Sequence, residues 1–307
     1  MAATLDRLTR RWEALPDNAR GALWVIAASA GFSAMAALVK VLGQSLDSFQ
    51  IAFFRCLVGL AVLSPLLLRS GLSTLRTTRP VLHLGRAAAG MTAMFCGFYA
   101  FTHLPLATAT AITFTKPLFM IVVAVLFLGE VVRWRRWTAT AVGFCGVLVM
   151  VRPGVGTFEP AMLVSLAQAL SVAIAVALVK SFPRTEGTLT ILFYFAILST
   201  LISTGPALLV WRDPTWEQLG IAVVMGGLGV SSQAAIVRGY RIGEATAVAP
   251  FDYSRLLFAA FFGFVLFAEV PDVWTWLGAG VIIASTLYIA RREAKTGAPP
   301  KAGPAPH

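Results

Sequence analysis

The sequence predicts an all-α integral membrane protein with ten transmembrane helices, arranged as two inverted repeats of five helices each. Three observations lead to this prediction. Hydrophobic residues make up 58% of the chain and charged residues only 13%, whereas a soluble domain carries about 25% charged residues. Long apolar segments follow one another with short breaks between them. The second half of the chain also repeats features of the first.

A helix needs roughly 20 mostly apolar residues to cross a bilayer. The breaks between such segments contain proline, glycine or clustered charge, as in HLP at 103–105, RPG at 152–154 and WRDPTW at 211–216. The ten predicted spans are 21–41, 48–68, 82–102, 105–127, 134–151, 160–182, 188–211, 216–237, 244–268 and 272–290. The short connections leave no room for a soluble domain.

Positive charge predicts which side of the membrane each break faces. With the N-terminus in the cytoplasm, 18 of the 25 Lys and Arg residues lie on the cytoplasmic side, three lie on the other side and four lie within spans. The three are Lys40, Arg152 and Arg212, and the four are Arg55, Arg86, Lys116 and Arg255. Cytoplasmic loops carry such an excess. We therefore expect a multi-pass membrane protein with both termini in the cytoplasm, and the net charge of +11 reflects orientation rather than nucleic-acid binding.

The repeat is found by shifting the sequence on itself. At a shift of 139 residues TKPLF (115–119) aligns with SRLLF (254–258), and Glu130 aligns with Glu269. At a shift of 140, ALVK (37–40) aligns with ALVK (177–180). The predicted organisation is a cytoplasmic N-terminal segment (1–20), a first repeat (21–152), a second repeat (159–291) and a disordered cytoplasmic tail (292–307). Because five is odd, the second repeat inserts upside down, which is typical of transporters that alternate access to a midplane site.

The motif LPLATATAITFTKPLF…LFLGE (104–130) and its counterpart GEATAVAPFDYSRLLFAAFFGFVLFAEVPD (243–272) resemble the paired signature of the drug/metabolite transporter superfamily. Within it, the chain is similar to the ten-helix branch built from two EamA-type repeats, and the resemblance extends to bacterial amino-acid exporters of the YddG type. The resemblance implies a cavity formed mainly by spans 1–4 and 6–9. It also implies a bacterial inner-membrane location and small organic substrates such as amino acids, nucleotide-like metabolites or drugs.

Charged residues inside the spans are the first candidates for a substrate site, because a charge at the centre of a span costs about 2.5–3.5 kcal/mol on insertion scales. Lys116 and Arg255 are repeat mates, so the inverted symmetry brings both near the midplane. Asp252 is the acid deep in a span, and it can pair with Arg255 on its own helix or with Lys116 across the repeats. Two interpretations are open. The three residues form a structural network, or one cation receives a substrate carboxylate.

Further candidates accompany these three. Pro117 removes a backbone donor and is expected to kink the fourth span, although membrane helices tolerate proline in any case. Glu130 and Glu269 end spans 4 and 9 on opposite faces and are expected to act as gates or as structural caps. Arg86 is expected to reach the cytoplasmic interface. The remaining candidates for substrate binding are Arg55, Phe95, Tyr99, Tyr253, Gln168 and Gln233.

Enzymatic chemistry finds no support in the sequence. It has no paired-aspartate metal motif, no histidine cluster, no nucleotide-binding glycine loop and no Ser/His/Asp set. We therefore expect no enzyme, no cofactor and no metal. The expected partners are a small-molecule substrate and the lipid bilayer, in a monomer or homodimer. The predicted function is amino-acid export by alternating access. Transport of nucleotide-like metabolites or drugs is the first alternative, and a channel or a retinal-type protein is an alternative of another class.

Overall fold

The computed structural model describes residues 15–70, 76–128, 134–151, 159–181, 188–243 and 248–296. This part of the chain is helical, without strands, and the prediction of ten spans is confirmed. The first half comprises α2 (Asp17–Leu42), α3 (Ser48–Ser70), α4 (Pro80–His103), α5 (Leu106–Thr113), α6 (Lys116–Leu128) and α7 (Trp134–Val151). The second half comprises α8 (Pro160–Lys180), α9 (Thr188–Leu209), α10 (Trp216–Ile242), the 3-10 helix η2 (Ala249–Tyr253), α12 (Ser254–Phe267) and α13 (Val273–Thr296).

The fourth and ninth spans are each broken in the middle. The fourth is divided into α5 and α6, which are separated by Phe114 and Thr115. Pro117 is the second residue of α6, and its missing N–H removes a donor that a continuous helix would direct at Thr113. The ninth span begins as the 3-10 helix η2 and becomes α-helical at Ser254. Both breaks lie one or two residues before the repeat-mate cations, so Lys116 and Arg255 each stand in the first turn of a half-helix.

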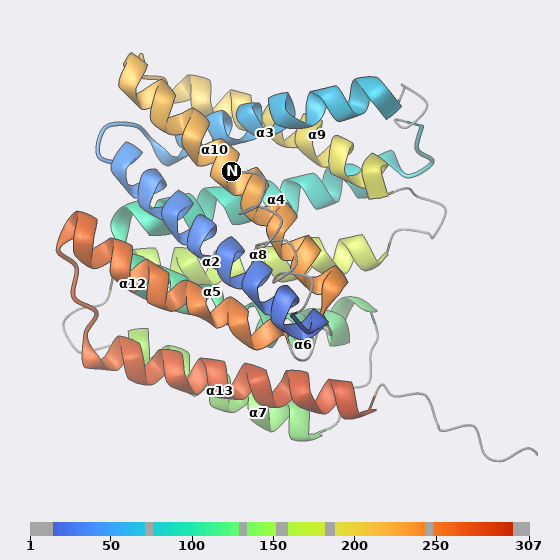
Figure 1. Cartoon of the computed structure of the whole chain (residues 1–307), viewed down its shortest axis with the longest axis vertical. Helices are drawn as coiled ribbons and strands as arrows, with labels where there is room; N and C mark the ends of the chain where they lie inside the picture. Colours follow the sequence, from blue (N-terminus) through green and yellow to red (C-terminus); the bar gives the residue numbers. More distant parts are fainter. Residues whose placement is uncertain are drawn as a thin grey trace, which may run out of the picture.

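Contacts between the halves follow an approximate two-fold pattern. Helix α2 packs extensively on α10, and their repeat mates α8 and α4 pack on each other in the same way. Helix α3 packs on its own mate α9, and α7 packs on its mate α13. The α7–α13 pair lies at one edge of the molecule, away from α3, α9 and α10 (Figure 1). This arrangement leaves α2, α4, α5, α6, α8 and α12 to enclose the centre.

The outer surface is apolar. Six helices in the described residues are long and apolar enough to cross a membrane, and Trp137–Val149 and Val273–Ser285 are shorter apolar helices. Large side chains that point outward include Leu126, Leu201 and Phe264, which are 72%, 64% and 61% exposed. In water such a surface would be an unusually large apolar patch. The hydrocarbon of a bilayer is the solvent that suits it.

Candidate functional site

A cavity of about 180 Å³ lies between the two halves. Small or aromatic side chains make up most of its wall, which also includes the two cations Lys116 and Arg255 and the amide of Gln168. The lining residues are Phe32, Ser33, Met35, Ala36, Met94, Gly97, Phe98, Phe101, Thr110, Thr113, Lys116, Gln168, Val172 and Arg255. They come from α2, α4, α5, α6, α8 and α12, so both halves build the cavity, and the peripheral pair α7 and α13 contributes none of these residues.

Lys116 is the cation of the first half. It begins α6 and its side chain is half-buried at the cavity wall. Its ammonium makes no hydrogen bond or ion pair with any residue that the structure describes. The start of a helix is the positive end of its dipole, which favours an anion. Lys116 therefore presents an uncommitted positive charge to the cavity.

Arg255 is the cation of the second half, and it is partly committed. Its Nη2 donates to Asp252 Oδ1 at 2.9 Å, one turn earlier on the same span, and the two side chains are 18% and 24% exposed. The guanidinium also lies 4.5 Å from the ring centroid of Phe32. Arg255 Nε is buried and donates to none of the described groups. Of the two predicted pairings, the structure has the one within the span, and Arg255 keeps a donor to spare.

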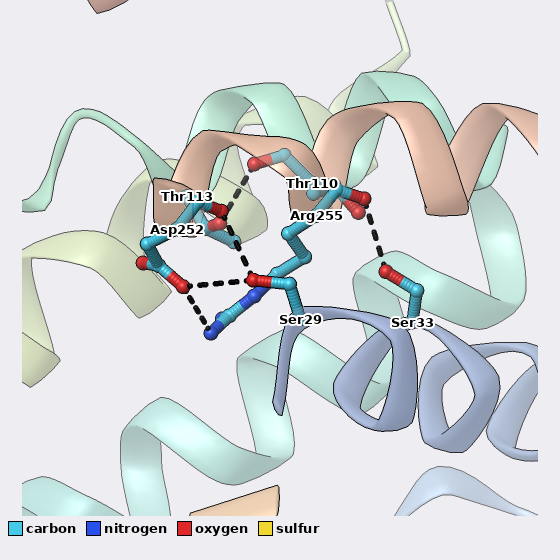
Figure 2. A network of polar contacts seen from close by, with 6 residues as sticks. All are labelled: Ser29, Ser33, Thr110, Thr113, Asp252 and Arg255. Atoms are coloured by element: carbon cyan, nitrogen blue, oxygen red, sulfur yellow. Dashed lines mark hydrogen bonds and ion pairs between the residues drawn. The ribbon is translucent and has the colours of Figure 1, made fainter. Parts of the chain in front are cut away.

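Two serines of α2 hold the broken ninth span in place (Figure 2). Ser29 Oγ lies 3.4 Å from both the carbonyl oxygen and Oδ1 of Asp252. Ser33 Oγ donates to the carbonyl oxygen of Arg255 at 3.0 Å. Both hydroxyls are directed at oxygens of the second half, so α2 of the first half contacts the ninth span at the point where its helix type changes. In α5, Thr113 Oγ1 donates to the Thr110 carbonyl at 2.7 Å.

Gln168 on α8 adds a neutral polar group to the wall. A Cβ on Gly97 of α4 would lie 2.5 Å from Gln168 Nε2, so the glycine leaves room for the amide between the two helices. Gln168 Oε1 is buried and accepts no hydrogen bond within the described ranges. A buried acceptor without a donor costs about 1–3 kcal/mol. An acceptor at a cavity wall is therefore suited to a donor on a ligand.

Arg55 of α3 lies behind this wall. Its guanidinium nitrogens would be 3.3 and 3.4 Å from a Cβ on Gly229 of α10, and the Met35 sulfur would be 3.0 Å from the same point. Met35 lines the cavity, whereas Arg55 does not. At a shift of 140 its repeat mate is Phe195, which packs in the same way on Gly90 of α4. Equivalent places in the two halves thus hold an arginine and a phenylalanine.

Like Arg55 and Asp252, four more of the predicted binding residues do not line the cavity. Phe95 packs edge-on against Phe49, with ring centroids 4.8 Å apart. Tyr99 is 39% exposed and stacks on His103. Tyr253 packs against Phe114, with centroids 4.8 Å apart. Gln233 is exposed on α10.

The residues predicted as gates, as a helix kink and as an interface cation have different surroundings. Glu269 forms an ion pair with Lys40 of α2. Glu130 lies outside the described residues. Pro117 is exposed at the start of α6, next to Lys116. Arg86 of α4 lies over the Phe195 ring, 4.5 Å from its centroid, so it packs between α4 and α9.

Sequence reasoning missed the contribution of the first span. Phe32, Ser29 and Ser33 contact the Asp252–Arg255 pair, yet none was a candidate. The available signal was two serines spaced i, i+4 in an otherwise apolar helix, which places both on one face.

Comparisons with known proteins agree with this architecture. Residues 19–152 and 159–291 each match the model of the EamA-like transporter family. An S-adenosylmethionine uptake transporter of Rickettsia bellii is 34% identical over 283 residues, covering 92% of this chain and 97% of the relative. A riboflavin transporter of Rhizobium johnstonii is 33% identical over 279 residues, covering 89% of this chain and 91% of the relative.

Two further comparisons add an exporter and a solved structure. The pseudopaline exporter CntI of Pseudomonas aeruginosa is 30% identical over 278 residues, covering 89% of this chain and 96% of the relative. A solved crystal structure with 19% sequence identity has a TM-score of 0.60 and covers 89% of this chain and 98% of the other. The latter similarity supports the fold alone.

Proposed function

Since the chain belongs to the EamA-like transporter family, we propose that it carries a metabolite bearing an α-amino-acid group through the central cavity by alternating access. Membership in this family makes it a multi-pass transporter of a small molecule. The substrate class and the residues that bind it are our proposal. The uncommitted Lys116 ammonium at the cavity wall is the observation that carries it.

The net charge of the site favours a substrate with an anionic group. Lys116 and Arg255 contribute two positive charges and Asp252 one negative charge, so the site is net positive. Each cation stands in the first turn of a half-helix, where the dipole adds to its field. Lys116 is the primary contact for a carboxylate, because Arg255 is already paired with Asp252. The spare Arg255 Nε is a second donor.

The substrate should also carry a hydrogen-bond donor for the Gln168 amide oxygen. Gln168 Oε1, on the opposite half from Lys116, has no donor among the described residues, and a substrate ammonium group would supply one. Carboxylate and ammonium on one carbon are the defining groups of an α-amino acid. Phe32, Phe98 and Phe101 then provide an apolar wall for the rest of the molecule.

Size limits what this conformation accepts. The cavity of about 180 Å³ is smaller than the roughly 300–1,000 Å³ of most ligand sites. It would accept an amino-acid head group, and a longer substrate would extend toward an opened end. S-adenosylmethionine is an amino acid joined to a nucleoside, so the relatives that take it up make it the first larger substrate to test. Riboflavin has no α-amino acid group and represents the alternative class of nucleotide-like metabolites.

Direction and orientation are further parts of the proposal. Positive charge favours cytoplasmic termini in an inner membrane. Export of amino acids is the direction proposed, and it needs no coupling ion when the substrate runs downhill. The relatives include both uptake transporters and an exporter.

The test is uptake by proteoliposomes of the purified chain. A panel of labelled amino acids, S-adenosylmethionine and riboflavin is assayed with and without a pH gradient. We expect saturable uptake of substrates that have both a free α-carboxylate and a free α-amine, and weak competition from the methyl ester or the deaminated acid. Equal competition from the ester would overturn the proposal. Uptake of riboflavin alone would select the alternative, and a linear flux would indicate a channel.

A further inference from the structure

Arg86 is a cation within a span that lies outside the central cavity. Its guanidinium lies over the Phe195 ring, between α4 and α9. Nε and Nη1 are buried and donate to none of the groups that the structure describes. The residue as a whole is half-buried, so Nη2 is the nitrogen left for an acceptor from outside. Because a guanidinium stays protonated in proteins, this position carries a charge that has no counter-ion among the described residues.

The helices around Arg86 provide no acid. Helix α4 packs on α8 and α9, and α3 packs on α9 and α4. None of α3, α4, α8 and α9 contains an aspartate or a glutamate in its sequence. The ring face of Phe195 offsets only part of the cost of holding a charge in a membrane span. The remaining compensation has to come from an anion that these helices do not contain.

Aromatic contacts fix the guanidinium in this place. His83, one turn before Arg86 on the same face, stacks on Tyr194 with ring centroids 4.3 Å apart. A Cβ on Gly90, one turn after Arg86, would lie 2.6 Å from Phe195 Cε2, so the glycine admits the ring that supports the guanidinium. Positions spaced i, i+3 and i+7 on one face of α4 thus meet two consecutive rings of α9. These contacts hold the charge between the two helices.

The contact between Arg86 and Phe195 lies close to one end of the spans. Arg86 is six residues from the start of α4 and Phe195 seven from the start of α9, which corresponds to about 9–11 Å at 1.5 Å per residue. Arg69, Arg76 and Arg79 belong to the same end and are exposed. This end is the predicted cytoplasmic side, where the leaflet carries anionic lipids. A guanidinium at this depth can reach a lipid phosphate at the edge of the hydrocarbon.

We propose that Arg86 binds the phosphate of an anionic phospholipid from the cytoplasmic leaflet, at the place where α4 meets α9. The head group supplies the acceptor that Arg86 lacks, and the acyl chains lie in the bilayer. The exposed arginines at this end favour a lipid with net negative charge over a zwitterionic one, whose ammonium group they repel. The site is separate from the central cavity, because neither Arg86 nor Phe195 lines it. Lipid binding here goes beyond the proposed transport and does not depend on it.

The test is lipid binding by the purified full-length chain in detergent, measured by native mass spectrometry. Phosphatidylglycerol and phosphatidylcholine with the same acyl chains are titrated separately. We expect phosphatidylglycerol to bind more tightly, and Arg86→Met to raise its Kd by about 10- to 150-fold, the range for one hydrogen bond to a charged group. Arg86→Lys keeps the charge and should keep most of the preference for phosphatidylglycerol.

Arg238→Met is the matched control. Arg238 also lies over a ring, 5.0 Å from the Trp24 centroid, near the predicted cytoplasmic end of α10, but it is exposed. Its replacement should leave the Kd for phosphatidylglycerol unchanged. Melting curves separate binding from a structural role. Phosphatidylglycerol should raise the melting temperature of the unmodified chain, and Arg86→Met should lose this rise without melting lower in the absence of lipid.

Several results would overturn the lipid site. An unchanged Kd in Arg86→Met, or an equal rise in Arg238→Met, would show only a general attraction of lipid to a basic surface. Equal binding of the two lipids would remove the role of charge, and displacement of phosphatidylglycerol by an equal concentration of inorganic phosphate would indicate a site for a free anion. Arg86→Gln replaces Arg86→Met if that variant does not fold. Binding needs no transported substrate, so a failure to transport amino acids leaves this test readable.

Discussion

At the residue scale, the argument for an anion site depends on Lys116. Replacing it with methionine removes the charge and keeps much of the volume. A hydrogen bond to a charged group contributes about 1.5–3 kcal/mol, so we expect the KM for an amino-acid substrate to rise by about 10- to 150-fold while the yield of folded protein changes little. The measurement is initial uptake over a range of substrate concentrations, with the yield taken from size-exclusion chromatography.

Two matched variants complete this experiment. Lys116→Arg keeps the charge and should retain most of the transport. Gln233→Leu changes an exposed residue of α10 that does not line the cavity and should leave KM unchanged. Normal KM together with poor folding in Lys116→Met would instead identify Lys116, Asp252 and Arg255 as a structural network.

At the scale of helices, alanine substitutions at two glycines are expected to have opposite effects on KM and on stability. A Cβ on Gly97 of α4 meets the end of the flexible Gln168 side chain, which can move. A Cβ on Gly146 of α7 would lie 2.9 Å from the backbone oxygen of Gly278 in α13, which cannot move without separating the helices. We expect Gly97→Ala to raise KM by displacing the Gln168 amide, with little change in stability.

Gly146→Ala should behave in the reverse way. Overpacking costs about 1–3 kcal/mol, and α7 and α13 contribute none of the residues that line the cavity. The expected result is a lower melting temperature in detergent and an unchanged KM. A larger change of KM in Gly146→Ala than in Gly97→Ala would contradict this division between cavity helices and edge helices.

At the scale of the whole molecule, the orientation is open to a direct test. Excess Lys and Arg on one set of loops predicts that both termini are cytoplasmic. A green fluorescent protein fused after His307 should therefore fluoresce, and alkaline phosphatase fused at the same point should be inactive. Active phosphatase would contradict the predicted orientation and place the Lys40–Glu269 pair at the cytoplasmic end.

The sequence predicted the fold well because spans and repeats leave strong signals. Hydropathy marked the ten spans, and the repeat brought Lys116 and Arg255 into correspondence. The faces of individual helices were harder to predict. Phe95 and Phe98 are three residues apart on α4, yet Phe98 lines the cavity and Phe95 packs against Phe49. In a helix that is apolar all round, periodicity does not separate the lipid face from the cavity face.

The change of helix type in the ninth span also made the direction of a side chain hard to predict. Tyr253 ends the 3-10 helix η2, which turns more tightly than an α-helix, and its ring packs against Phe114 rather than into the cavity. Ser29 and Ser33 escaped notice because their role depends on contacts with Asp252 and Arg255, which are more than 200 residues away in the sequence. Such a role becomes visible only once the two helices are placed together.

The exchange of Arg55 for Phe195 at equivalent places in the two halves has a kinetic consequence. A carrier made of identical halves would offer the same affinity to both faces of the membrane. Here one half sets a guanidinium beside Gly229 and the other sets a ring beside Gly90. Half-saturation from the two sides is therefore expected to occur at different concentrations. For passive flux the ratio Vmax/KM must still be equal in both directions, so the side with the lower KM also has the lower maximal rate.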